Sequence, residues 1–257
     1  MPAVIHAGLF AFGTFVAIVV ALELGRRIGL AQLAADPEGA RTGTGAVDAA
    51  VYGLLGLLIA FTFSGAATRF EERRQLIRDE ANAIGTAYLR LDLLPAEAQG
   101  PIKERFRQYL DARLSAYGKL PDVAAARAEL DRSTQIQREI WRDVVAALAL
   151  PGAPAAVVVL PPINEMFDLA TTRLVAKQSH PPVVIFLMLG STAVLAALLA
   201  GYGMAGSRSR KLLHPLVFAV VMATAIYVIL DLEYPRFGLI RIDTADQILV
   251  DVRNSMR

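Results

Sequence analysis

The sequence predicts an all-α integral membrane protein with four transmembrane helices and an extramembrane helical bundle between the second and third of them. Of the 257 residues, 55% are hydrophobic, above the ~45–50% that is usual in soluble domains. Four apolar stretches approach the ~20 residues that an α-helix needs to cross a bilayer. The middle of each is free of charged residues, and backbone polar groups in hydrocarbon must pair within a helix.

The four expected spans are Val4–Leu22, Ala46–Ala67, Val183–Ala205 and Leu212–Leu230. The first lacks the basic n-region and the small-residue cleavage site of a signal peptide, so we expect an uncleaved span. Asp48 lies in the first turn of the second span, where a helix N-terminus favours an anion. The short basic loop Ser207–Lys211 predicts a tight hairpin between the last two spans.

The second helix is expected to continue beyond the membrane. No proline occurs between Ala67 and Pro95. Apolar residues recur there at helical spacing, at Phe70, Ile77, Ile84 and Leu91. Leu-Pro pairs then separate two further expected helices, about Ala96–Gly118 and Asp122–Leu150.

Val144–Leu160 resembles a fifth span, but Pro151, Gly152 and Pro154 interrupt it and Pro161-Pro162 reads as a stop. We therefore expect a buried or interfacial segment, followed by an amphipathic helix over Ile163–Ser179. The chain divides into a transmembrane hairpin (residues 1–68), an extramembrane helical domain continuous with the second span (69–180), a second hairpin (181–233) and a C-terminal tail (234–257).

Composition and motifs exclude several functions. Arg69–His180 contains sixteen Lys/Arg and fifteen Asp/Glu, a mixture typical of solvated helix faces, so no nucleic-acid partner is expected. The chain has no cysteine, phosphate loop, zinc-protease motif or nucleophile elbow, and its histidines are scattered: His6, His180 and His214. We therefore expect no enzyme, no catalytic residue, no metal and no cofactor.

The second span is the candidate pore helix. Gly53, Leu57 and Phe61 recur at i, i+4 and i+8 on one face, followed by Ser64 and Thr68. An apolar stripe that passes into small hydroxyl residues suits a hydrophobic constriction opening onto a wetter vestibule. The alternative is ordinary helix packing, in which small residues let neighbours approach. No charged group lies at mid-membrane, which argues against a proton pump or ion-coupled transporter but not against a passive pore.

Two polar clusters remain. The helix before the third span carries Asn164, Glu165, Asp168 and Arg173. The first three are a conceivable cation site, and the alternative is a solvated face or a buried interhelical network. Asp231 and Glu233, with Arg236, close the fourth span and are interpreted as an interfacial anchor.

The segment Leu58–Arg74 resembles the second-span signature of bestrophins, with Phe61 followed two turns later by Thr68-Arg69-Phe70. Over nearly its full length, the chain resembles a bacterial bestrophin-like family. The recurrent pieces of that family appear as Glu80–Arg90, Asn164-Glu165-Met166, His180-Pro181-Pro182, Asp231-Leu-x-x-Pro235-x-x-Gly238 and Asp251–Met256.

The resemblance implies a pentameric anion channel in the bacterial inner membrane, with the middle block and both termini in the cytoplasm. The arginine distribution around the spans does not decide this orientation. Matched residue by residue, the apolar neck falls on Gly53, Leu57 and Phe61, although Gly53 departs from the bulky pattern. Ser64, Thr68 and Arg69 would line the vestibule. The acidic calcium clasp of animal bestrophins has no evident counterpart.

Two functional hypotheses follow. The first is an oligomeric channel that passes small anions through the bilayer without a coupled ion. The second is a non-conducting scaffold or sensor whose helical domain binds a partner. Small residues suited to close helix packing occur in the last two spans, at Gly190, Ala193, Ala197, Ala219 and Ala223.

Overall fold

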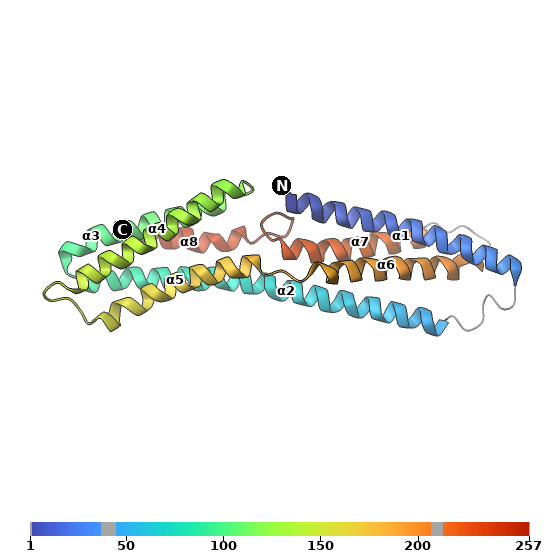
Figure 1. The fold of residues 1–257 in the computed structure, drawn as a ribbon, viewed down its shortest axis with the longest axis horizontal. Coiled ribbons are helices and arrows are strands. Elements are labelled where there is room, and N and C mark those ends of the chain that lie inside the picture. Colours follow the sequence, from blue (N-terminus) through green and yellow to red (C-terminus); the bar gives the residue numbers. More distant parts are fainter. Residues whose placement is uncertain (1, 37–44, 207–212, 257) are drawn as a thin grey trace. The chain divides into compact units, whose positions relative to one another are not determined.

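The computed structural model describes residues 2–36, 45–206 and 213–256, which are helical apart from short connections (Figure 1). The helices are α1 (Pro2–Ala35), α2 (Gly45–Arg90), the 3-10 turn η2 (Leu91–Leu93), α3 (Ala96–Gly118), α4 (Val123–Leu148), α5 (Ala156–Gln178), α6 (Val183–Gly203), the 3-10 turn η3 (Met204–Gly206), α7 (Leu213–Glu233) and α8 (Asp243–Ser255). The all-α fold class is confirmed. The expected hairpin loop Ser207–Lys211 lies outside the described residues.

Among the residues that the structure describes, four helical stretches are long and apolar enough to cross a membrane: Gly8–Ala35, Gly45–Leu93, Ala156–Gly203 and Leu213–Glu233. The chain is therefore a multi-pass membrane protein. It forms two compact units. The span unit comprises Met1–Phe70 and His180–Ile240, and the helical unit comprises Glu71–Ser179 and Arg241–Arg257. The long helix α2 contributes to both units.

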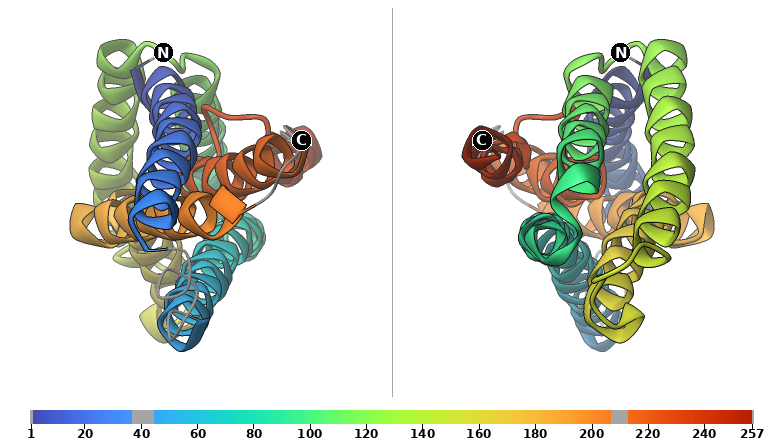
Figure 2. Two further views of the ribbon diagram at one scale, coloured as in Figure 1. Left: turned by 90° about the vertical axis from the view of Figure 1, so that its right-hand side faces the viewer. Right: turned by 90° about the vertical axis from the view of Figure 1, so that its left-hand side faces the viewer.

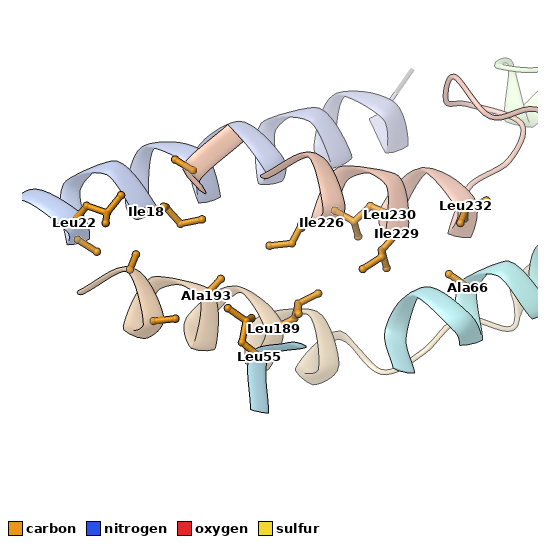
Figure 3. Close-up of a cluster of buried hydrophobic side chains, with 14 residues drawn as sticks. Ile18, Leu22, Leu55, Ala66, Leu189, Ala193, Ile226, Ile229, Leu230 and Leu232 are labelled. Atoms are coloured by element: carbon orange, nitrogen blue, oxygen red, sulfur yellow. The ribbon is translucent and has the colours of Figure 1, made fainter. Parts of the chain in front are cut away.

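In the span unit, α1 and α6 touch through their backbones. A Cβ atom on Gly25 would lie 1.9 Å from the carbonyl oxygen of Leu198, and one on Gly201 would lie 2.0 Å from that of Leu22. Lipid gives apolar helices no hydrophobic drive to associate, so such close packing stabilises the pair instead. Buried side chains from α1, α2, α6 and α7 meet in one cluster (Figure 3), to which Ala193 also belongs. This small residue of α6 therefore packs inside the protomer.

In the helical unit, α3 and α4 lie side by side (Figure 2). The bounds of α3 are those expected from the sequence. The carboxylate of Asp122 accepts a 3.0 Å hydrogen bond from the backbone N–H of Ala125 and so caps the first turn of α4. The buried side of α2 includes Ile77 and Ile84, which are at most 1% exposed, so this half of the helix is a core element.

The prediction that Pro161-Pro162 stops a helix is wrong. Both prolines lie inside α5, which begins at Ala156. A proline in a helix interior costs ~3 kcal/mol because it removes a donor and crowds the preceding turn. Fully buried Val159, Ile163 and Met166 recur at helical spacing around the pair, and each buried side chain of this size contributes ~1.5–3 kcal/mol.

Two other segments differ from simple expectation. The apolar run after Val144 is broken by a turn between α4 and α5, where Gly152 has a φ of +75°, a backbone conformation that side chains disfavour. The segment predicted as a polar tail forms α8, whose Leu249 is fully buried. The side chain of Arg253 in α8 pairs with Asp111 of α3 at 2.7 Å.

Candidate functional site

Within the span unit, α2 has two contrasting faces. Leu55 and Ala66 are 3% and 0% exposed and belong to the buried cluster (Figure 3). The opposite face carries Gly53, Leu57 and Phe61, and the last two side chains are 51% and 68% exposed. The side chains predicted to form an apolar neck therefore line one open face of a single chain.

The spanning part of α2 is also the least covered of the four candidate spans. Only 6% of its apolar window is buried, against 33% for the stretches that contain α1 and α6 and 22% for α7. A side chain added at Gly53 would meet nothing within 4 Å. The outer face of α2 is thus available to lipid or to another protomer.

The expected vestibule residues follow the same face. Ser64 and Thr68 are exposed, one and two turns beyond Phe61. Their hydroxyl groups end the apolar stripe just before the first basic residue of the helix, Arg69. Because Ser64 and Thr68 follow Phe61 by three and seven residues, the helical repeat keeps them near the face of Leu57 and Phe61.

The Arg69 guanidinium is paired with a buried carboxylate. Its Nε donates a 2.8 Å hydrogen bond to Oε1 of Glu233, at the end of α7, and a second guanidinium nitrogen contacts the same oxygen. The Glu233 side chain is 1% exposed and the Arg69 side chain 29%. A Cβ atom at Gly65 would lie 3.2 Å from the Arg69 guanidinium, so the glycine leaves room for that group to fold back along α2.

The second oxygen of Glu233 faces the connection that leads into α6. Its Oε2 lies 3.5 Å from Nδ1 of His180, and the imidazole stacks on the ring of Tyr234 with centroids 4.7 Å apart. One carboxylate thus contacts residues from α2 and from the His180-Pro181-Pro182 connection. We call Arg69, His180, Glu233 and Tyr234 the junction cluster.

Asp231 closes the loop that follows α7. Its carboxylate oxygens accept hydrogen bonds of 2.9 and 2.7 Å from the backbone N–H groups of Leu239 and Ile240. A Cβ atom on Gly238 would fall 1.6 Å from Oδ1 of Asp231, so only glycine fits there. The spacing from Asp231 to Gly238 therefore has a local structural cause.

Sequence reasoning treated Asp231 and Glu233 together as an interfacial anchor and missed the contact between Glu233 and Arg69. The two residues are 164 positions apart. The sequence did contain a signal for this contact. Thr68-Arg69-Phe70, His180-Pro181-Pro182 and the segment that begins at Asp231 all belong to the resemblance to bestrophins, although they lie far apart in the chain. The structure brings parts of all three together in the span unit.

A second buried charge cluster lies in the helical unit. Glu80 of α2 is fully buried and contacts both Arg113 of α3, at 2.7 Å, and Arg173 of α5. The ring of Tyr117 lies 5.6 and 4.7 Å from these two guanidinium groups. Asp246 of α8 is 3.6 Å from Arg173, so four helices each contribute one charge.

The third candidate group, Asn164, Glu165 and Asp168, lies on an exposed face of α5. Met166 between them is fully buried, which explains the local pattern as one inward residue flanked by solvated ones. Across the described residues, no three His, Asp or Glu side chains gather in a way that could hold a metal ion.

The fold and the apolar helices define the class of this molecule as an α-helical, multi-pass membrane protein. The Bestrophin-like domain matches residues 12–246, and the chain belongs to this family. Among curated proteins, none matches the chain.

Solved structures similar to this chain include point variants of a bacterial bestrophin homologue from Klebsiella pneumoniae. One has a TM-score of 0.68 at 15% identity, covering 95% of this chain and 98% of its own. Another has a TM-score of 0.69 at 14% identity, covering 94% and 98%. A structure described as a membrane protein has a TM-score of 0.68 at 18% identity, covering 93% and 98%. At these identities the likeness shows the fold.

Proposed function

We propose that the protein is an oligomeric ion channel that passes small anions, with α2 of each protomer lining an apolar neck. The observation that carries this proposal is the open face of α2, on which Leu57 and Phe61 are 51% and 68% exposed. A ring of protomers would turn these faces toward a common axis. The protein would then transport ions rather than catalyse a reaction.

The residues on this face suit a passive neck. Rings of apolar side chains gate a pore by hindering its wetting, and Leu57 and Phe61 would supply two such rings. Gly53 would leave the first ring position wide. Ser64 and Thr68 would then offer hydroxyl groups where the passage widens into the vestibule.

An oligomer is needed because four spans are too few to enclose a pore within one chain. The resemblance to bestrophins favours a pentamer. A passive mechanism fits the charge-free middles of the four spans, since coupled transporters ordinarily carry an ionisable group there. Native mass spectrometry in mild detergents should give a closed oligomer, and a strictly monomeric species in all of them would contradict the proposal.

We place the protein in the bacterial inner membrane with the helical unit and both termini in the cytoplasm. Four spans separate the two ends of the chain, and two separate each end from the middle block. Reporter fusions at Lys119 and after Arg257 should therefore lie on the same side. Opposite locations would show that the number of spans is wrong.

The neck is tested by replacing Leu57 and Phe61 together with Ala. The wider, better hydrated neck should raise chloride flux into liposomes while thermal stability and assembly stay as in the wild type. A matched control replaces an exposed Leu and an exposed Phe of another span with Ala. These are Leu9 and Phe12 of α1, which are 60% and 65% exposed, and their replacement should leave the chloride flux unchanged.

The alternative outcomes separate the two functional hypotheses. Truncating a packed Leu or Phe typically costs ~2–5 kcal/mol, so lost stability or failed assembly of the double variant would assign Leu57 and Phe61 to packing. A stable variant with the flux of a conducting wild type would remove both from the neck. A wild type that is silent in planar bilayers under all conditions would favour the non-conducting scaffold.

A further inference from the structure

Arg69 is the residue from which an anion pathway along α2 would gain a positive charge. From Gly45 to Phe70, the part of α2 in the span unit, the only charged residues are Asp48 and Arg69. Arg69 adjoins Thr68, and its side chain remains 29% exposed. If these guanidinium groups had no carboxylate partner, a ring of them would attract anions, as rings of Arg or Lys do in anion pores.

Glu233 opposes that charge at contact distance. Its carboxylate is 1% exposed and lies 2.8 Å from the Arg69 Nε, so the negative charge is held where the positive one arises. Nδ1 of His180 lies 3.5 Å from the second carboxylate oxygen, and the imidazole stacks on the ring of Tyr234. The second acid of this region, Asp231, is occupied by the backbone N–H groups of Leu239 and Ile240.

We propose that Glu233 limits the anion preference of the channel by cancelling the charge of Arg69 beside the vestibule. The inference rests on the proposed function, in which α2 lines the pathway. Glu233 touches no permeating ion in this scheme and acts through Arg69, as a specificity-determining residue outside the neck. Selectivity in the wild type then arises from groups other than Arg69.

The size of the effect follows from Coulomb's law. A unit charge ~10 Å from an ion in a water-like dielectric changes the local concentration of that ion about twofold, and each protomer of a ring adds its own contribution. Freeing the guanidinium should thus raise the anion-to-cation permeability ratio at least about twofold.

The experiment compares four reconstituted proteins by their reversal potentials in a potassium chloride gradient. Glu233→Gln leaves Arg69 uncompensated and should shift permeability toward anions. Arg69→Gln leaves Glu233 uncompensated and should shift it toward cations. The double variant removes both charges and should return the ratio to that of the wild type. Asp231 is unchanged in all four proteins.

A matched control breaks a different ion pair. Glu129→Gln in the helical unit frees Lys119, its partner, and should leave the ratio unchanged. If the junction pair had only a structural role, both single variants would disturb the same local packing, and the permeability ratio would shift in the same direction in both.

The outcomes are decisive. Opposite shifts with return in the double variant support the proposal. If the protein conducts but the permeability ratios of the single variants do not change, or change in the same direction, the proposal is overturned while the proposed channel function stands. Failure of both single variants to assemble, with recovery in the double variant, assigns the pair a structural role and also overturns it. A silent wild type overturns the proposed function, and this inference with it.

Discussion

Glu80 and Glu233 are two carboxylates with the same burial, 0% and 1% exposed, in very different surroundings. In the helical unit, Glu80 lies between two guanidinium groups that are themselves at most 9% exposed. In the span unit, Glu233 pairs with Arg69, which is 29% exposed. The Glu80 arrangement is a network of charges that are all buried in a core. In the Glu233 arrangement, a buried carboxylate pairs with a partly solvated cation. Burial of an acid therefore does not identify its role, whereas the exposure of its partner helps to do so.

The most severe way to break this comparison is Glu80→Gln. The change leaves the buried Arg113 and Arg173 without their shared carboxylate, and removing one member of a buried ion pair typically costs ~3–5 kcal/mol. The loss should appear as a lower midpoint of the unfolding transition of the detergent-solubilised protein. Glu104→Gln on α3, where the carboxylate is 54% exposed, is the control and should change stability little. Equal losses of stability in the two variants would mean that the buried Glu80 network stabilises the fold no more than an exposed ion pair does.

Glu233→Gln sharpens the comparison because its cost to stability should be smaller. Arg69 can recover solvation when it loses its partner, so we expect a loss of ~1.5–3 kcal/mol, the usual contribution of a hydrogen bond to a charged group. The same unfolding assay measures it. A loss as large as that of Glu80→Gln would show that the junction cluster is as closed as the core network.

The smallest effect is expected at the pair of Lys119 and Glu129, because the Lys119 side chain is 42% exposed. The Lys119 ammonium beside it lowers the pKa of the Glu129 carboxyl. A carboxyl whose folded pKa is depressed contributes stability above its unfolded pKa of about 4.3, and that contribution is lost as the pH falls through the folded value. The difference in stability between wild type and Glu129→Gln should therefore be small at neutral pH and vanish under acid conditions. A difference that grows with acidification would contradict the assignment.

Helix bounds were readable from sequence where local signals agreed. The Leu-Pro pairs and the polar capping residue Asp122 locate the start of α3 and α4, because proline and N-cap chemistry act within a turn. The same logic failed at Pro161-Pro162, where buried side chains at helical spacing outweigh the lost donors. The sequence shows the local free-energy cost of two prolines in a helix. It does not show the compensating burial of neighbouring apolar side chains, because that burial depends on which other helices pack there.

The sequence by itself determined the four spans, the all-α class and the stripe of α2 that carries Gly53, Leu57 and Phe61, since length, hydropathy and the 3.6-residue repeat are properties of one segment. Only the tertiary structure decided that Arg69 is paired with Glu233 and that Glu80 holds Arg113 and Arg173. Contacts across 164 residues depend on which helix faces meet, and identical Arg and Glu side chains offer many equivalent pairings until packing selects one.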